Sequence, residues 1–140
     1  MIPVNRPLIY SKNNIEIEKS LSLKWISGDG PIVKKFEQKF SKIIGSKFGV
    51  TVSNGTAALE VALAALKLKP GSKVIVPNLT IISCLNAILR NNLKPVFVDV
   101  NETDFNICIS DLKKKVNKNI KALIMVHTYG LPSNVGEIML

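Results

Sequence analysis

Short apolar runs alternate with longer stretches of mixed apolar and polar residues along this 140-residue chain. The runs are apolar at successive positions, which is typical of strands that are covered on both faces. We predict four such strands, at residues 50–52, 73–77, 95–100 and 121–126. The stretches between them have the composition or spacing of helices, at residues 56–67, 81–89 and 111–116. This alternation predicts an α/β fold with a mainly parallel sheet, right-handed crossovers and flanking helices.

Two further helices are predicted before the first strand, one over residues 15–23 and one over residues 31–44. Pro31 is a favoured first helical residue, and the second helix carries its apolar side chains on one face. Gly45 suits the left-handed position that ends a helix. We therefore expect residues 1–30 to form an amino-terminal arm, a short helix and a loop, and residues 31–140 to belong to a large α/β domain.

A tight polar turn, Ser53-Asn54-Gly55-Thr56, joins the first predicted strand to a helix rich in Ala and Leu. A helix start presents unpaired N–H groups and a partial positive charge, so a phosphate group can dock there. Gly55 would let the backbone approach an anion closely, and the Ser53 and Thr56 hydroxyls could add hydrogen bonds. Residues of these types are also preferred helix caps, so the turn by itself is compatible with capping alone.

Four loop segments should meet at one edge of the sheet, because ligands of parallel α/β sheets bind beyond the carboxyl ends of the strands. These segments are residues 53–56, 77–80, 99–101 and 127–129. The phosphate interpretation of the turn gains support from this placement. His127 and Tyr129 also fall at this edge, where we expect His127 to be a buried structural imidazole or, alternatively, a ligand contact.

The net charge of +9 raises the question of an anionic partner. The densest basic group, Lys113-Lys114-Lys115 with Lys118 and Lys121, lacks interleaved aromatic residues and lies on a helical pattern. We therefore predict a solvated face there and no nucleic-acid partner. A small molecule that carries phosphate would suit the charge at least as well.

The sequence gives no sign of a membrane, a metal or a disulfide framework. No apolar run approaches the length of a membrane span, so we expect a cytoplasmic protein without a membrane partner. Cys84 and Cys108 lack the spacing of a metal site, and we expect both to be buried, reduced thiols.

The sequence stops at an apolar residue soon after the last predicted strand, which would leave that strand at an exposed edge. We therefore expect an incomplete domain, produced by a split gene, a truncated frame or an excerpt.

Five motifs follow one another in order and cover nearly all of the chain. They are Gly28-Asp29-Gly30-Pro31-Ile32-Val33 with Phe36-Glu37, Ser53-Asn54-Gly55-Thr56-Ala57-Ala58-Leu59, Pro70-Gly71-Ser72-Lys73-Val74-Ile75-Val76-Pro77, Pro95-Val96-Phe97-Val98-Asp99-Val100, and Val126-His127-Thr128-Tyr129-Gly130-Leu131-Pro132. Together they resemble the signatures of the DegT/DnrJ/EryC1/StrS aminotransferases, which are fold-type-I enzymes that depend on pyridoxal phosphate. The chain corresponds to the first third or so of such an enzyme, and so to an incomplete part of its large cofactor-binding domain.

The resemblance implies how the cofactor is held. Gly55 and Thr56, with Ser53 and Asn54 in the same turn, would bind the phosphate of pyridoxal 5'-phosphate. The family places an aromatic ring over the pyridine just after Thr80, where this chain has Ile81. An aliphatic side chain can cover a ring face, but it lacks a stacking contribution of about 1 kcal/mol.

The resemblance also implies the reaction. Enzymes of this family aminate keto sugars on nucleotides, so we expect a nucleotide-linked keto-deoxy sugar, such as a 4-keto-6-deoxy hexose, and glutamate as substrates. The product would serve surface polysaccharide or other glycan biosynthesis. Asn5, Asp29, His127 and Tyr129 are the candidate substrate contacts. A homodimer, or a pair with a complementary carboxyl-terminal chain, is the expected assembly.

One component of the family's chemistry is missing. A transaminase needs a lysine that forms the Schiff base and moves protons. In the family that lysine lies further along the chain, and no lysine here is placed to replace it, because Lys73 and Lys121 begin strands at the opposite edge. The chain alone is therefore expected to be inactive. The alternative function is a non-catalytic module that binds an anion or dimerises.

Overall fold

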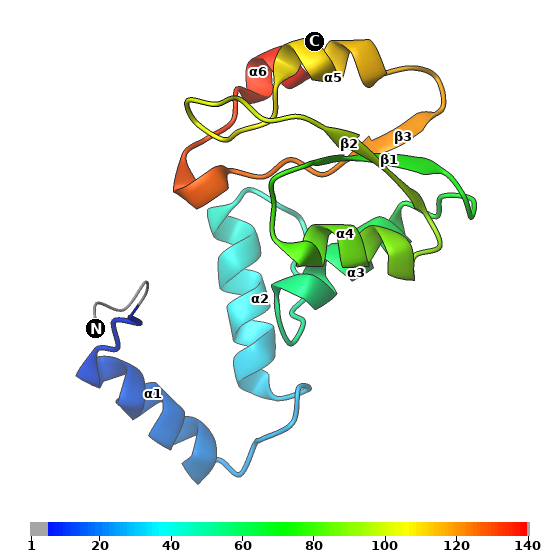
Figure 1. Cartoon of the computed structure of the whole chain (residues 1–140). Coiled ribbons are helices and arrows are strands. Elements are labelled where there is room, and N and C mark those ends of the chain that lie inside the picture. Colours follow the sequence, from blue (N-terminus) through cyan, green and yellow to red (C-terminus); the bar gives the residue numbers. More distant parts are fainter. Residues whose placement is uncertain (1–5, 140) are drawn as a thin grey trace. The chain divides into compact units, whose positions relative to one another are not determined.

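The computed structural model describes residues 6–139 and divides the chain into two units, Met1–Thr51 and Val52–Leu140. The first unit holds two helices, α1 (Ser11–Ser22) and α2 (Pro31–Ile43). The second unit holds the sheet and its helices (Figure 1): α3 (Gly55–Ala65), β1 (Lys73–Pro77), α4 (Ile82–Arg90), β2 (Lys94–Val98), α5 (Ile109–Lys115), β3 (Ile120–Leu123), the 3-10 turn η1 (Thr128–Gly130) and α6 (Val135–Ile138). The predicted boundary after residue 30 stays a prediction.

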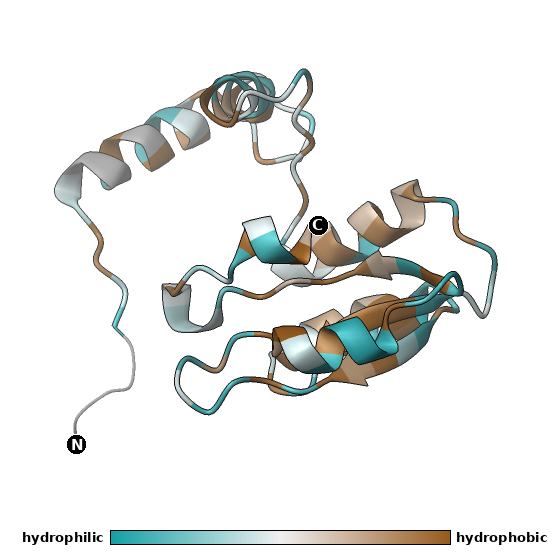
Figure 2. Cartoon of the chain, turned by 90° about the horizontal axis from the view of Figure 1, so that it is seen from above, coloured by the Kyte–Doolittle hydropathy of each residue, from teal (hydrophilic) through white to brown (hydrophobic). Residues whose placement is uncertain are grey.

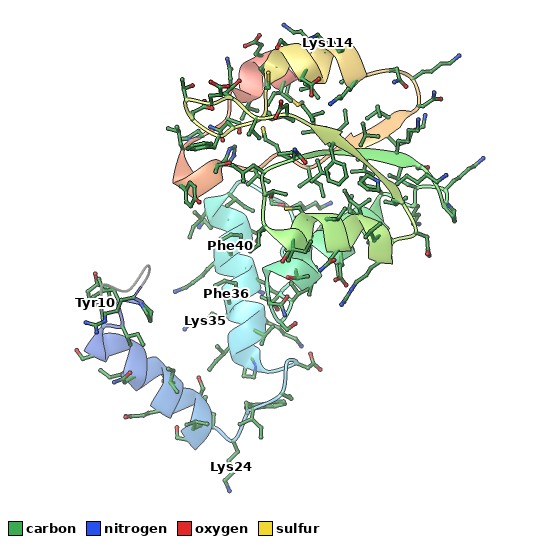
Figure 3. The ribbon with its side chains drawn as sticks, in the orientation of Figure 1. Tyr10, Lys24, Lys35, Phe36, Phe40 and Lys114 are labelled. Carbon is green, nitrogen blue, oxygen red and sulfur yellow. The ribbon has the colours of Figure 1, made fainter. Side chains whose placement is uncertain are left out.

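The apolar face predicted for α2 is present but largely uncovered. Phe36 and Phe40 lie one turn apart (Figure 3) and stack with ring centroids 5.7 Å apart. Their exposed fractions are 55% and 48%, and Ile43 is 81% exposed. In the part of the chain that the structure describes, the helical pattern was therefore predicted correctly, whereas the burial that usually accompanies it is incomplete.

Gly45 ends α2 as predicted. Its φ of +68° is in the left-handed region, where a side chain would be strained. The N–H of Gly45 donates to the carbonyl of Lys42, and the N–H of Ser46 donates to the carbonyl of Ser41 at 2.8 Å. This pair of bonds is the Schellman arrangement, which satisfies carbonyl groups that the last turn of a helix leaves unpaired.

The strand predicted over residues 50–52 is absent, which corrects the sequence interpretation. Val50 is 78% exposed, and the segment has no strand partner among residues 6–139. Instead, the N–H of Thr51 donates to Glu37 Oε1 of α2 at 2.7 Å, and the Thr51 hydroxyl donates to the same oxygen at 2.8 Å. Gly49 allows the close approach, because a Cβ there would lie 2.8 Å from the carbonyl oxygen of Glu37. Three β-branched or apolar residues form a strand only where a neighbouring strand can accept their backbone hydrogen bonds.

The other three predicted strands form one parallel sheet in the order β2-β1-β3. The bounds of β1 agree with the prediction, while β2 and β3 end earlier than the predicted residues 100 and 126. Along β1, Lys73 is paired with Lys94, and Pro77 with Val98. Consecutive strands therefore all run in one direction and need helical crossovers, as the sequence pattern indicated.

The central strand β1 contributes side chains to two separate hydrophobic clusters. Val74 and Val76 face a cluster on the side of α3 and α4 that includes Leu63, Cys84, Ala87, Ile88, Leu93 and Ile124. Ile75 faces the opposite side, where it packs with Val98, Ile107 and Leu112. Neighbouring residues of a strand point to opposite faces, so both faces of β1 are covered by helices, α3 and α4 on one and α5 and α6 on the other (Figures 1 and 2). The predicted class, an α/β fold with a mainly parallel sheet and flanking helices, is confirmed.

The remaining helices lie close to their predicted positions, with two corrections. Helix α5 begins at Ile109, before the predicted residue 111, and has Cys108 as its N-cap residue without a side-chain cap bond. Cys84 is buried as expected, whereas Cys108 is partly exposed. Among the described residues, no helix has the length and apolar character needed to span a membrane.

The bond from Thr51 to Glu37 yields a prediction for the pH dependence of stability. The backbone N–H of Thr51, and then its hydroxyl, hold the pKa of the Glu37 carboxyl below its usual value of 4.5. A lowered folded-state pKa stabilises the fold above the unfolded-state pKa, and this contribution is lost as the pH falls through the folded-state pKa. Glu37→Gln should therefore lower the denaturant midpoint at pH 7, and the difference from wild type should shrink as the pH falls below about 4.

Urea titrations of both proteins between pH 7 and pH 3 would measure this difference. Glu18→Gln is the matched control, since it removes an exposed carboxylate of α1 that has no side-chain hydrogen bond to any described residue. A Glu37→Gln midpoint equal to wild type at pH 7 would contradict the assigned role of this bond.

Candidate functional site

A crevice lies between the carboxyl ends of β1 and β3. The chain leaves β1 toward α4, on one face, whereas the chain after β3 leads to α6, whose Ile138 packs on the other face. Adjacent strands whose connections leave toward opposite faces form the usual ligand position of such sheets. A cavity of about 340 Å³ occupies this position and is lined by Leu79, Thr80, Ile81, Val126, His127, Thr128 and Tyr129. Two of the four predicted loop segments, those after β1 and β3, therefore do meet there.

In the first turn of α3, one backbone N–H group is capped by a side chain, and other N–H groups have no acceptor among the described residues. The Asn54 side chain caps the helix, because its Oδ1 accepts the Ala57 N–H at 2.9 Å. The carbonyl of Asn54 accepts the N–H of Ala58. The N–H groups of Gly55 and Thr56 have no hydrogen-bond acceptor among the described residues. The capping interpretation is therefore right for Asn54, and two amide donors stay available beside it.

Gly55 is not required by the fold of the chain itself. A Cβ on this residue would meet no atom within 4 Å, and its φ is not in the left-handed region. Alanine is also the better helix former. A glycine at such a position leaves room for another group to approach the backbone, and the approach of a phosphate there stays a prediction.

Thr56 connects the turn to the crevice wall. Its hydroxyl is hydrogen-bonded to the Ser83 hydroxyl at 2.8 Å, which links the first turn of α3 to the first turn of α4. Helix α4 begins directly after Ile81, which lines the crevice and is 67% exposed. The turn itself lines a neighbouring cavity of about 410 Å³, bounded by Ser53, Asn54, Thr56, Ala57, Glu60 and Arg90. The hydrogen bond between Thr56 and Ser83 therefore holds the predicted phosphate turn close to Ile81. The turn and Ile81 nevertheless line two different cavities.

His127 and Tyr129 both line the crevice, and neither side chain is buried. The expectation of a buried imidazole is wrong, because the loop after β3 leaves the His127 ring exposed. Its Nδ1 nevertheless accepts the N–H of Ser133 at 3.0 Å. Tyr129 is 97% exposed and has a φ of +52°, a conformation uncommon for a residue other than glycine. Two polar rings therefore face solvent at the crevice from a loop with an unusual backbone.

The predicted segment after β2 belongs to a different cavity. The N–H of Asp99 donates to Asp111 Oδ2 at 2.8 Å, and Lys115 Nζ donates to the same oxygen at 2.6 Å. The Asp99 amide, and then Lys115, lower the pKa of the Asp111 carboxyl. These groups line a cavity of about 260 Å³ at the end of β2. Because they satisfy one another, they fasten α5 to the end of β2.

Two predicted substrate contacts lie outside the second unit. Asp29 is exposed in the turn before α2, and Asn5 lies outside the described residues. Their contact with substrate stays a prediction. In the described part of the chain, no group of three or more His, Cys, Asp and Glu side chains is placed to hold a metal ion.

The basic residues of the second unit lie mainly away from the crevice. Lys73 and Lys94 begin β1 and β2, and Lys121 is the second residue of β3, so all three are at the amino ends of the strands. The crevice lies at the carboxyl ends, and no lysine of the described residues lines it. The excess charge of the chain therefore does not by itself identify the crevice as an anion site, and the suggestion that a phosphate-bearing ligand suits the charge stays a prediction.

Sequence reasoning missed Asn106 and Ser133, two buried polar residues that support the crevice loop. Their exposed fractions are 3% and 5%, and the Ser133 hydroxyl lies 3.1 Å from Asn106 Oδ1. The only available signal was a polar residue between the apolar Phe105 and Ile107, which indicates a buried hydrogen-bonding group without naming its partner.

Comparisons with known proteins agree with this geometry. GDP-perosamine synthase of Escherichia coli O157:H7 is 38% identical over 138 residues, which are 99% of this chain and 38% of that protein. The spore coat polysaccharide biosynthesis protein SpsC of Bacillus subtilis is 36% identical over 99% of this chain and 35% of its own length. The chain thus spans well under half of the curated relatives it matches.

A solved structure supports the same relationship. The GDP-4-keto-6-deoxy-D-mannose-3-dehydratase of E. coli, solved with bound hydrated pyridoxal phosphate, superposes with a TM-score of 0.90. It is 32% identical and covers 97% of this chain, while the chain covers 36% of that structure. The cofactor expected from the sequence is therefore the one that this relative holds. The profile of the DegT/DnrJ/EryC1/StrS aminotransferase family matches residues 7–139. The chain belongs to the DegT/DnrJ/EryC1/StrS aminotransferase family.

Proposed function

We propose that this chain forms the pyridoxal-phosphate-binding part of an enzyme that aminates a nucleotide-linked keto-deoxy sugar. The observation that carries the proposal is the pair of amides at Gly55 and Thr56, which have no acceptor among the described residues. The bond between Thr56 and Ser83 fixes this pair next to Ile81. A phosphate at the helix start and a ring in the crevice would then belong to one ligand.

The chain's own residues fit the phosphate of the cofactor. The N–H groups of Gly55 and Thr56 would donate to phosphate oxygens, and the open space over Gly55 would let those oxygens approach. The Ser53 side chain is exposed at the same turn and could add a hydroxyl donor. Asn54 would keep the turn in shape through its cap bond to Ala57.

The crevice residues would orient the ring. Ile81 would cover one face through apolar contact, and His127 and Tyr129 line the crevice from the loop after β3. When bound, pyridoxal phosphate supplies an electron sink for the transfer of an amino group. The chain's part is to hold and orient the cofactor.

We place the covalent attachment of the cofactor outside this chain. No lysine of the described residues lines the crevice, and Lys73 and Lys121 lie at the opposite edge. A complementary carboxyl-terminal polypeptide would supply that lysine and the proton transfers. The chain by itself would therefore bind the cofactor and not complete a turnover.

The finer substrate assignment rests on the relatives. GDP-perosamine synthase and the dehydratase both carry a GDP-sugar in their names, and SpsC is named for polysaccharide biosynthesis. We propose a 4-keto-6-deoxy hexose on a nucleoside diphosphate as amino acceptor, glutamate as donor, and a cytoplasmic role in surface polysaccharide biosynthesis. Asn5, Asp29, His127 and Tyr129 are the proposed substrate contacts.

The lack of a lysine in the crevice also favours a second candidate. In that case the chain would be a non-catalytic module that binds an anionic ligand or dimerises. The two candidates differ in ligand, because the module needs only phosphate groups, whereas cofactor binding also uses the pyridine ring.

The ligand preference of the unmodified chain separates these candidates. Pyridoxamine phosphate is the suitable probe, because its amine cannot condense with exposed lysines. At a ligand concentration about 100 times Kd, binding should raise the free energy of unfolding by about 2.7 kcal/mol, seen as a higher Tm in a thermal shift assay. Stabilisation by GDP alone, lost in Thr56→Ala, would instead favour the anion-binding module.

Gly55→Ala tests the phosphate position without disturbing the fold. The added Cβ meets no protein atom, so the free energy of unfolding should stay equal or rise slightly. Affinity for pyridoxamine phosphate should fall by at least about tenfold, because the methyl group occupies the approach to the amides. Isothermal titration calorimetry measures the affinity, and Gly136→Ala in α6 is the matched control. Equal affinities of Gly55→Ala and wild type would argue against a phosphate at this turn.

Ile81→Phe tests the position of the ring. An aromatic side chain here should add a stacking contribution of about 1 kcal/mol and tighten pyridoxamine phosphate binding roughly fivefold. Ile82→Phe is the control, since Ile82 is similarly exposed, at 62%, but does not line the crevice. Equal gains in both variants would show that the ring does not lie against residue 81.

A further inference from the structure

Asn106 joins two loops that are distant in the sequence. Its Oδ1 lies 3.1 Å from the Thr128 N–H nitrogen and 3.1 Å from the Ser133 hydroxyl, both of which can donate to it. Its Nδ2 donates to the carbonyl of Leu131 at 3.2 Å. All three partners lie in the segment after β3, whereas Asn106 lies between β2 and α5. Because Asn106 is only 3% exposed, water cannot easily replace these bonds.

The backbone of Asn106 is itself held in place. Its N–H donates to Asp104 Oδ1 at 2.9 Å, and its carbonyl accepts the N–H of Asn101 at 2.9 Å. The Asn101 side chain also donates to Asp104 Oδ1. Next to it, Val100 and Ile107 form an isolated antiparallel bridge, and Ile107 is buried in the core. The side chain of Asn106 therefore projects from a fixed support.

The network ends at the histidine that lines the crevice. Ser133 is 5% exposed, and its hydroxyl can donate either to Asn106 Oδ1 or to the carbonyl of Val126. The N–H of Ser133 donates to His127 Nδ1 at 3.0 Å. Since Nδ1 accepts this bond, the proton of the neutral imidazole resides on Nε2. Nε2 has no hydrogen-bond partner among the described residues.

We propose that Asn106 is a positioning residue that acts through Ser133 to hold His127 with its Nε2–H available to an acceptor atom of a cofactor in the crevice. Several bonds of the loop after β3 are internal to it, such as those from the Gly130 N–H to the carbonyl of His127 and from the Leu131 N–H to the carbonyl of Thr128. Asn106, together with the carbonyl of Phe105, which accepts from the Thr128 hydroxyl, ties this loop to the segment before α5. The identity of the ligand rests on the proposed function, whereas the order of the loop does not.

Amide hydrogen exchange of the free chain tests the positioning role. In Asn106→Ala, the amides of Thr128 and Ser133 should exchange roughly tenfold faster than in wild type, a change of about 1.4 kcal/mol in local opening. Asn91→Ala is the matched control: Asn91 Nδ2 donates to the carbonyls of Glu60 and Ala87, so its loss destabilises α4 without touching the loop. Unchanged exchange at Thr128 and Ser133 in a folded Asn106→Ala would overturn the proposal.

The single histidine of the chain gives a direct spectroscopic readout. In wild type labelled with 15N-histidine, the Ser133 amide should couple to Nδ1, and Nε2 should carry the proton. This coupling should be lost in Asn106→Ala and retained in Asn91→Ala. Ser133→Ala is a milder second variant that keeps the amide but removes the hydroxyl, and it should weaken the coupling even if Asn106→Ala does not fold. Full coupling in Ser133→Ala would count against transmission through the hydroxyl.

Ligand titration separates this inference from the proposed function. If wild type binds pyridoxamine phosphate, the Nε2 signal should shift on binding, and Asn106→Ala should bind roughly tenfold more weakly than Asn91→Ala. Binding with no Nε2 shift, or with equal affinities, would overturn the role of His127. If wild type does not bind this probe, the proposed function and the ligand contact both fail, and the exchange data decide the positioning role alone.

Discussion

The complete burial of β1 between two apolar layers is the constraint on which the rest of the second unit depends. Val74, Ile75 and Val76 have exposed fractions of zero, and they point alternately to the two faces. Each face therefore needs a helical cover, and the connections after β1 and β3 must leave in opposite directions to provide it. The crevice follows from this divergence, because the two loops separate where the strands end. The position of the site is thus a consequence of core packing and needs no residue dedicated to opening it.

Most of the fold could be predicted because its signals are local. Continuous apolar runs identified β1, β2 and β3, and Pro31 and Gly45 marked the two ends of α2. The failure at residues 50–52 is instructive, since an apolar run specifies strand conformation only when a neighbour can pair with it. Thr51 found its partner in a glutamate carboxylate of the preceding helix, and no propensity or periodicity signals such a bond. The exposed apolar face of α2 likewise shows that a periodic apolar pattern predicts a helix but does not predict which element packs against its apolar face.

The candidate site could be predicted in part, for the same reason. The turn at residues 53–56 is set by the start of α3, and the position of Ile81 by the start of α4, and a sequence reveals helix starts. The exposure of His127 depends on the conformation of the loop after β3, and the role that we propose for Asn106 depends on partners more than 20 residues away, as in the bond from Thr128 to Asn106. Such contacts arise when two loops of separate crossovers meet at one edge of the sheet. The spacing of residues in the sequence does not predict which residues of the two loops come into contact.

The helix start at Gly55 shows why the capping and phosphate interpretations are not alternatives. A helix has four N–H groups without intrahelical acceptors, and one capping side chain satisfies only one or two of them. Asn54 accepts from Ala57, the third residue of α3, and thereby fixes the first turn, while the two preceding amides have no acceptor in the described part of the chain. Lys73 and Lys94 could not supply this preference, because they lie at the amino ends of β1 and β2. A few aligned backbone dipoles at short range would therefore outweigh a larger number of screened charges in selecting where an anion binds.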